Sequence, residues 1–253
     1  MANNAQVTNL TWMGFEESVR SREMTKVIMP IGSIEQHGPH LPLATDTVIA
    51  DYVARRVSER CANAFLMPPI HLGCSGEHLG FPGTISLQPE TVGSIVMDVS
   101  VSLLRSGLRK VFIINGHGGN RATLDAAIIK VKQGLPEMQL CSFTIIDVVK
   151  EKFAEVRKSA RRLVGHADEI ETSMMLAIRP EVVDMSKAVR EEPSLPQALS
   201  FEAEDLAKIS FAWNAKQLTK TGVIGDARMA SAETGNALLT FVVDTIANAI
   251  NAL

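Results

Sequence analysis

The 253-residue chain has few of the residues that mark several common protein classes. It has three cysteines, Cys61, Cys74 and Cys141, an odd and widely spaced set that excludes a disulfide framework. We therefore expect a reducing compartment. Aromatic residues make up only 5% of the chain and are scattered, so no aromatic stacking platform is expected.

An excess of charge of one sign and long hydrophobic runs are also missing. The 25 basic residues against 28 acidic ones give a net charge of −3, which argues against nucleic acid or anionic lipid as a partner. Residues 150–162 are locally basic, but Glu151 and Glu155 interrupt them, as on a solvated helix face. No apolar run approaches the length of a membrane span, and the start lacks a signal-peptide pattern. The expectation is a cytoplasmic protein without membrane contact.

The chain does contain enough apolar residues, 46%, to build a sizeable core. Apolar runs predict strands at 26–32, 65–67, 110–115 and 140–146, and amphipathic stretches predict helices at 46–60, 91–106, 120–134 and 231–253. This alternation predicts an α/β fold with a mostly parallel sheet covered on both faces. We interpret residues 188–221 as an irregular excursion, a lid or an oligomer contact, within a single domain spanning 1–253.

The first histidine-containing segment, residues 31–46, directly follows the first predicted strand. Glu35 and His37 are two residues apart, so they point the same way in an extended segment. Asp46 stands at the start of the next helix, where its carboxylate can turn back. One imidazole and two carboxylates suit Zn²⁺, Mn²⁺ or Fe²⁺. The alternative is a helix N-cap at Asp46 with two solvated loop residues, but the glycine and prolines between them favour a fixed loop and therefore ligands.

The second segment, Asn115-Gly-His-Gly-Gly-Asn120, follows the third predicted strand. Its glycines allow a sharp turn and close approach to a ligand, which places His117 at the carboxyl edge of the sheet. The N–H groups of Gly118 and Gly119 could bind an anion. A tight turn capped by Asn120 explains every residue except the histidine equally well.

In the third segment, His166 is followed by Asp168, Glu169 and Glu171 at the start of a predicted helix. The helix dipole favours acidic residues in a first turn, so one or two of them need no functional role. A histidine beside a glycine and three acids is harder to explain without a functional role. We therefore treat His166 as a candidate functional residue.

A fourth segment, residues 73–83, is rich in glycine and is expected to be a loop on the substrate side. Cys74 within it could act as a nucleophile with a histidine base, although nothing nearby lowers its pKa. Ser75 does not fit the G-x-S-x-G pattern, because Glu77 occupies the second glycine position. A metal-independent cysteine or serine hydrolase and a non-catalytic small-ligand binder stand as alternatives to a metal enzyme.

Taken together, four motifs in this chain resemble the creatininase (creatinine amidohydrolase) family. They are Gly32-Ser-Ile-Glu-Gln-His-Gly-Pro-His-Leu-Pro42, Phe81-Pro-Gly-Thr-Ile-Ser86, Asn115-Gly-His-Gly-Gly-Asn120 and His166-Ala-Asp-Glu-Ile-Glu-Thr-Ser173. The resemblance implies one three-layer α/β/α domain and a homo-oligomer, in that family often a hexamer. It also implies a hydrolytic site with two divalent metal ions that acts on a small-molecule substrate.

The resemblance further implies a role for each matching residue. Glu35 and His117 would hold one ion and His37 the other, with Asp46 bridging the two. His166 would act in proton transfer. The implied reaction is cleavage of an amide or cyclic amide by metal-activated water.

Two departures from creatininase itself place the chain in a Gly-Gly branch of the family. Creatininase has a metal-binding glutamate where this chain has Gly119, so we expect Glu169 to supply the fifth ligand, with Glu171 as the alternative. It also has aromatic residues where this chain has Gly118 and the stretch from Arg162, which makes creatinine a doubtful substrate. Members of the wider family act on formamides, peptides and cyclic polyol ketones.

Overall fold

A four-stranded parallel sheet forms the centre of the chain. In this computed structural model, which describes residues 6–160, 164–194 and 214–253, the strand order is β2-β1-β3-β4. The strands are β1 (Lys26–Ile31), β2 (Ala64–Leu66), β3 (Lys110–Asn115) and β4 (Gln139–Thr144). Every pairing is parallel, as the alternation of predicted strands and helices requires.

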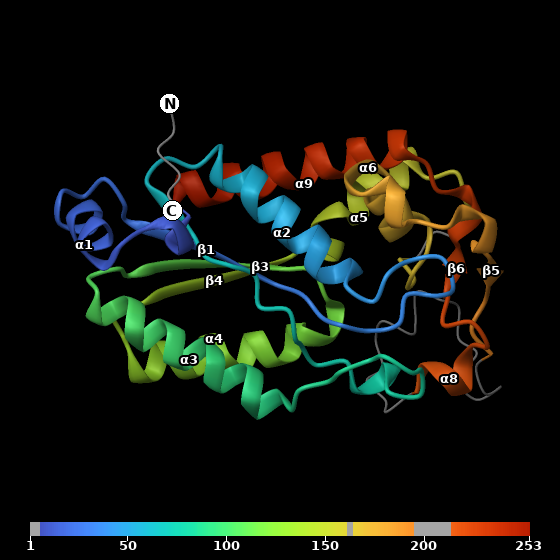
Figure 1. The fold of residues 1–253 in the computed structure, drawn as a ribbon, viewed down its shortest axis with the longest axis horizontal. Coiled ribbons are helices and arrows are strands. Elements are labelled where there is room, and N and C mark those ends of the chain that lie inside the picture. The colour runs from blue at the N-terminus through green and yellow to red at the C-terminus, as the bar shows by residue number, and fades with distance from the viewer. Residues whose placement is uncertain (1–5, 161–163, 195–213) are drawn as a thin grey trace.

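Helices cover both faces of this sheet and make a three-layer α/β/α fold (Figure 1). They are α1 (Trp12–Arg20), α2 (Thr45–Ser58), α3 (Pro89–Arg105), α4 (Arg121–Gly134), α5 (Ile145–Val156), α6 (Glu169–Ile178), the short α8 (Ala215–Leu218) and α9 (Ala232–Ala252). Helices α2, α5, α6 and α9 lie on one face, and α3 and α4 on the other. The predicted fold class is confirmed.

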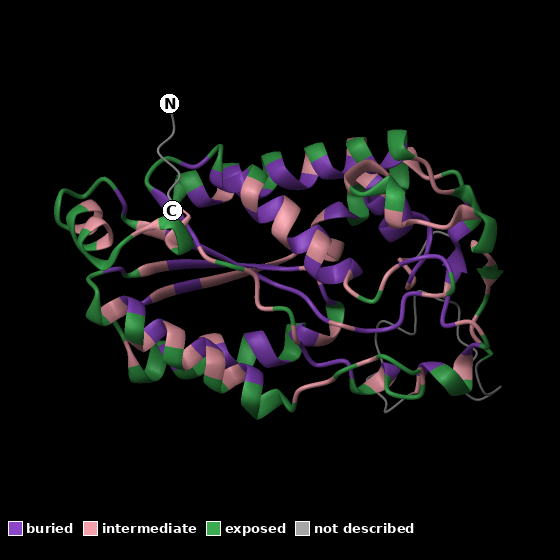
Figure 2. Ribbon diagram, viewed as in Figure 1, coloured by how far each residue is buried: buried purple, intermediate pink, exposed green. Residues whose placement is uncertain are grey.

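Strands β1, β2 and β3 are mainly apolar because both of their faces are buried, whereas the edge strand β4 is largely half-buried and more polar (Figure 2). Along β1, Val27 and Met29 pack into the core beneath α3 and α4, whereas Ile28 packs into the core beneath α2 and α9. Along β3, Val111 and Phe112 divide between the two cores in the same way. Since successive side chains alternate between faces, a doubly covered strand needs a continuous apolar run.

The predicted strands and helices agree with the structure to within two residues at each end, and two differences are informative. The fourth strand ends at Thr144, because Ile145 and Ile146 already belong to α5. There Ile145, Val149 and Phe153 make a buried stripe at helical spacing, which a β-branched run conceals in the sequence. Helix α1 was not predicted.

Part of the expected irregular excursion at 188–221, residues 195–213, lies outside the described residues. On either side of that gap, β5 (Arg190–Glu191) pairs antiparallel with β6 (Gly225–Asp226). Among the described residues, no helix has the length and apolar character needed to cross a bilayer.

Candidate metal centre

The candidate site lies at the carboxyl ends of β1 and β3. Ile31 and Asn115 are partners in register, so the segments that follow these two strands start side by side. The N-terminus of α2 packs directly against them. A Cβ atom on Gly116 would lie 2.2 Å from the backbone oxygen of Asp46, so only glycine permits this approach. The close packing brings Asp46 between the two strand ends.

A first group of buried donors consists of Glu35, Asp46 and His117. The Nδ1 atom of His117 lies 3.2 Å from Oε2 of Glu35 and 3.1 Å from Oδ2 of Asp46. Two carboxylates and one imidazole thus converge on one point. This is the set that the resemblance implies for one ion, whereas the spacing of the first segment grouped Glu35 and Asp46 with His37.

A second group consists of His37, Asp46 and Glu171. The Nε2 atom of His37 lies 3.0 Å from Oδ1 of Asp46 and 3.8 Å from Oε2 of Glu171. The two oxygens of Asp46 therefore face different groups, Oδ2 the first and Oδ1 the second. This is the arrangement of a carboxylate that can bridge two ions.

Several buried atoms of these groups face only other charged groups of the same cluster. Within the described residues, both carboxylate oxygens of Glu35, Nε2 of His37 and Oδ2 of Asp46 make no hydrogen bond. Burying so many ionisable groups together is costly, and a bound metal ion compensates for it. Mixed nitrogen and oxygen donors suit Zn²⁺, Mn²⁺ and Fe²⁺, so the residues present fit a divalent metal site.

Backbone carbonyls fix which nitrogen of each ligand histidine is available. Nδ1 of His37 lies 3.1 Å from the backbone oxygen of Glu35, and Nε2 of His117 lies 2.8 Å from that of Cys74. A carbonyl only accepts, so each of these nitrogens carries the proton. Nε2 of His37 and Nδ1 of His117 are then the nitrogens left to bind a metal, and without metal they carry a second proton toward the carboxylates.

The electrostatics of the site favour cations. Burial, with the nearby Asp46 charge, raises the pKa of Glu35 to about 7, and burial raises that of Glu171 to about 8. Burial alone would lower the pKa values of His37 and His117, but the surrounding carboxylates outweigh it and raise both to about 10. Asp46 is the exception among the acids: burial alone would raise its pKa, but His37 and His117 hold it below its usual value. Without metal, Glu35 and Glu171 thus tend to keep protons and the histidines are cations, so the site takes up positive charge from solution as protons.

The expected fifth ligand, Glu169, is not part of this cluster. Its carboxylate oxygens accept the backbone N–H groups of Lys158 (2.7 Å) and Ser159 (2.8 Å), which ties the end of α5 to the start of α6. Glu171 instead accepts the N–H of Ala167 and approaches the cluster. Residues two apart on a helix point about 200° from each other, so only one of the two acids can face the site. Of the two acids, the cluster therefore includes Glu171, the alternative, and not Glu169.

Gly119 shows why the carboxylate comes from α6. A Cβ atom there would lie 2.4 Å from both the backbone oxygen of Cys74 and Nε2 of His117. A side chain at Gly119 would displace the carbonyl that fixes the protonation of His117. The local backbone therefore excludes a ligand from this position.

His166 lies beside the cluster with one nitrogen facing it. Its Nε2 donates to the backbone oxygen of Gln36 (2.7 Å), and its Nδ1 lies 3.7 Å from Oε1 of Glu35. The ring contacts that of His37, with 4.5 Å between centroids. Burial and the charge of His37 hold the pKa of His166 well below its ordinary value. The neutral ring thus presents a lone pair at Nδ1.

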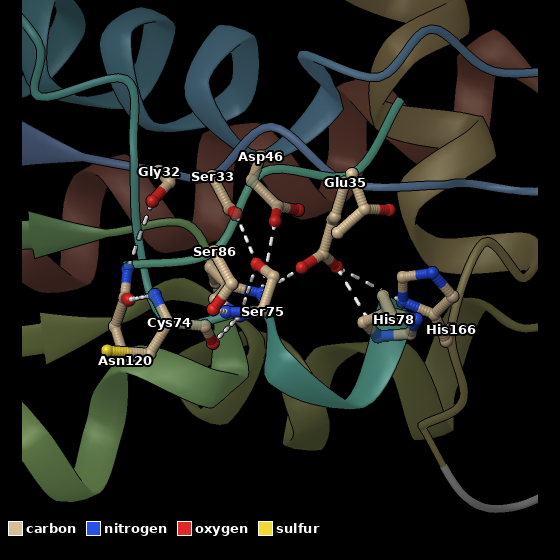
Figure 3. Close-up of polar contacts among 12 residues, drawn as sticks. Gly32, Ser33, Glu35, Asp46, Cys74, Ser75, His78, Ser86, Asn120 and His166 are labelled. Carbon is tan, nitrogen blue, oxygen red and sulfur yellow. Dashed lines mark hydrogen bonds and ion pairs between the residues drawn. The ribbon is translucent and has the colours of Figure 1, made fainter. Parts of the chain in front are cut away.

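His78, from the glycine-rich segment, is a site residue that the sequence analysis did not single out. It is buried, its ring stacks on that of His166 at 4.2 Å, and its Nε2 lies 3.6 Å from Oε1 of Glu35 (Figure 3). The available signal was its place between Glu77 and the Phe81–Ser86 motif, in a loop already expected to face the substrate.

Ser75 and Cys74 do not have the geometry of nucleophiles. Ser75 Oγ lies 3.3 Å from Nε2 of His117, whose other nitrogen faces Asp46, a superficially triad-like row. However, Nε2 donates its proton to the carbonyl of Cys74, so it cannot accept one from the serine. The Cys74 thiol lies 3.6 Å from the hydroxyl of Thr123 and packs into the core.

Comparisons with known proteins agree with the resemblance of the motifs. Residues 8–250 match the family model for creatininase, described as creatinine amidohydrolase. Creatinine amidohydrolase of Pseudomonas putida is 29% identical over 99% of this chain and 97% of its own length. The mycofactocin precursor peptide peptidase of Mycobacterium ulcerans (strain Agy99) is 34% identical over 86% of this chain and 81% of its own. A solved structure named creatininase Mn superposes with a TM-score of 0.81 at 27% identity, covering 99% of this chain and 98% of that one.

Proposed function

The chain belongs to the creatininase family, and from this premise we propose that it is a two-metal hydrolase cleaving a carbon–nitrogen bond, an amide or cyclic amide, in a small molecule. The observation that carries the proposal is the division of the two Asp46 oxygens between two groups of buried donors. One ion would be held by Glu35, Asp46 and His117, and the other by His37, Asp46 and Glu171. When bound, such ions acidify a water molecule and polarise the carbonyl that it attacks.

The protein's own contribution to the chemistry comes from His166. Its neutral ring presents a lone pair at Nδ1, while Nε2–H stays bound to the backbone oxygen of Gln36. Nδ1 accepts the proton of the attacking water and then delivers it to the nitrogen that leaves. A positioned acid–base group of this kind contributes about 10²–10⁴-fold in rate.

The substrate we propose is an amide other than creatinine. Gly118 has no side chain and no other atom near the position of a Cβ, among the described residues, so nothing at this position forms a wall against a planar ring. The similarity to a peptide peptidase supports amides more extended than a single small ring. Formamides and cyclic polyol ketones are the competing substrates.

A reconstitution experiment tests this function. The chain is made metal-free with a chelator, reloaded separately with Zn²⁺, Mn²⁺ or Fe²⁺, and assayed on cyclic amides, formamides, short peptides and cyclic polyol ketones. We expect two ions per chain by elemental analysis and turnover of a carbon–nitrogen substrate that is lost on chelation and restored on reloading. Undiminished activity of the metal-free chain, or release of every ligand unaltered, would contradict the proposal.

A further inference from the structure

Gln36 stands between two candidate metal ligands in the sequence, and its side-chain amide has a defined orientation. Its Oε1 accepts the N–H of Gly38 at 2.9 Å. Its Nε2 lies 3.2 Å from the backbone oxygen of Gly222, which only accepts. Both contacts require the nitrogen of the amide to be the atom that faces His78, at 2.9 Å from Nδ1.

This orientation sets the proton position on His78. An amide nitrogen donates, so Nδ1 of His78 accepts, and the neutral ring carries its proton on Nε2. The Nε2–H group is the one that faces Oε1 of Glu35, at 3.6 Å.

Toward the neighbouring ring, that of His166, Gln36 acts as a hydrogen-bond acceptor through its backbone and not as a donor. Its carbonyl accepts Nε2–H of His166 at 2.7 Å, so the lone pair of His166 lies on Nδ1. The rings of His78 and His166 stack with 26° between their planes. Glu35 Oε1 therefore meets an N–H from one imidazole and a lone pair from the other, at 3.6 and 3.7 Å.

We propose that Gln36 and His78 are positioning residues of the active centre, acting through Glu35 and His166. Gln36 fixes the hydrogen-bond direction of both stacked rings. The Nε2–H of His78 faces Oε1 of Glu35 at 3.6 Å, beyond hydrogen-bond distance, and attracts it electrostatically. This favours the orientation in which Oε2 points toward His117, 3.2 Å from Nδ1. His166 keeps its Nδ1 lone pair for the proton of the attacking water. The effect on turnover rests on the proposed function, whereas the proton positions do not.

Three substitutions separate this role from simple packing. Gln36→Glu keeps the shape and the contact with Gly38 but replaces the donor to His78 by an acceptor. His78→Phe keeps a ring against His166 without any N–H, and His78→Gln supplies an N–H without a ring. His71→Gln is the matched control, because His71 is exposed and we assign it no role.

The experiment combines nitrogen NMR of ¹⁵N-histidine-labelled chain, zinc-loaded and metal-free, with steady-state kinetics on the best substrate of the panel. The His78 signal is identified by its loss in His78→Phe. We expect His78 to carry its proton on Nε2 and, in Gln36→Glu, to become protonated on Nδ1. At unchanged metal content, kcat of Gln36→Glu should fall about 10–100-fold, the usual effect of losing such a partner, with little change in KM. His78→Gln should retain more activity than His78→Phe, and His71→Gln should be unchanged.

A proton on Nδ1 of wild-type His78, or full kcat in a Gln36→Glu chain that retains its metal, would overturn the proposal. Thermal unfolding checks that each variant is folded. If Gln36→Glu fails to fold, the NMR signals of the wild type and the ratio of the two His78 variants decide instead. If the wild type hydrolyses nothing on the panel, the proposed function fails while the NMR measurement still decides the proton positions.

Discussion

At the scale of single residues, the direction of each hydrogen bond decides which atoms of the site can bind a metal or move a proton. Sequence spacing was enough to single out Glu35, His37, Asp46 and His117, because residues that follow neighbouring parallel strands meet at one edge of the sheet. It could not separate Glu169 from the acid two residues later, since both lie in the first turn of α6 and the sequence does not say which side of that turn faces the site.

The two acids of α6 give the first prediction. Glu171→Gln should lower the metal content toward one ion per chain, because it removes one anionic ligand of the second group. Glu169→Gln is the matched control and should keep both ions. It should nevertheless lower the free energy of unfolding by about 1–3 kcal/mol, since one of its two backbone donors, Lys158 or Ser159, loses its acceptor. Elemental analysis and denaturant melts measure both effects, and the reverse pattern of metal loss would refute the assignment.

His166 gives the second prediction. His166→Gln should lower kcat by about 10²–10⁴-fold, because Nδ1 no longer accepts and returns the proton. The variant should keep two ions per chain, since neither of the two proposed ligand sets includes His166. A loss of one ion instead would identify His166 as a ligand together with Glu35 and His37, a third set of donors within reach of one another.

At the scale of elements, the site depends on how closely α2 packs against the ends of β1 and β3. The strands were predictable from sequence because both of their faces are buried, which leaves a continuous apolar run. The start of helix α5 was not, because its β-branched residues Ile145 and Ile146 continue the apolar pattern of β4. The close packing that aims Asp46 leaves two traces in the sequence, Gly116 and Gly32, where an added Cβ atom would meet Asp46 and Thr47, respectively. A glycine in a turn has many explanations, however.

Gly116 gives the third prediction. In Gly116→Ala the added methyl would meet the backbone of Asp46 and push the start of α2 away from β3. Overpacking of this kind costs about 1–3 kcal/mol in the free energy of unfolding, and the metal content should fall because Asp46 is displaced. Gly93→Ala in α3 is the control, since among the described residues nothing lies within 4 Å of its added Cβ. Equal metal content in the two folded variants would show that the position of α2 does not determine the site.

At the scale of the whole molecule, a chain with a net charge of only −3 concentrates several buried acids and imidazoles at one end of its sheet. The overall α/β/α fold follows from the pattern of apolar segments, but this concentration comes from loops that are far apart in sequence. The homo-oligomer stays a prediction from the resemblance, and the single domain over 1–253 stays a prediction from the sequence pattern and the resemblance.

The charge of the metal-free site gives the fourth prediction. His37 and His117, with pKa values raised to about 10, are protonated near neutral pH, as is much of Glu171, with a pKa raised to about 8. Protons therefore compete with metal, so binding should release protons and the apparent affinity should rise between about pH 6 and about pH 8. Calorimetry of Zn²⁺ binding in buffers of different ionisation enthalpy counts the protons. Binding without proton release would contradict the ligand assignment.

The most direct test of the central claim is anomalous diffraction from crystals of the zinc-loaded chain. Two-metal hydrolases hold their ions about 3.5–4 Å apart. We predict two anomalous peaks at that separation, one beside Oδ1 and the other beside Oδ2 of Asp46, with His37 next to the first and His117 next to the second. A single peak, or peaks that do not flank Asp46, would contradict the account.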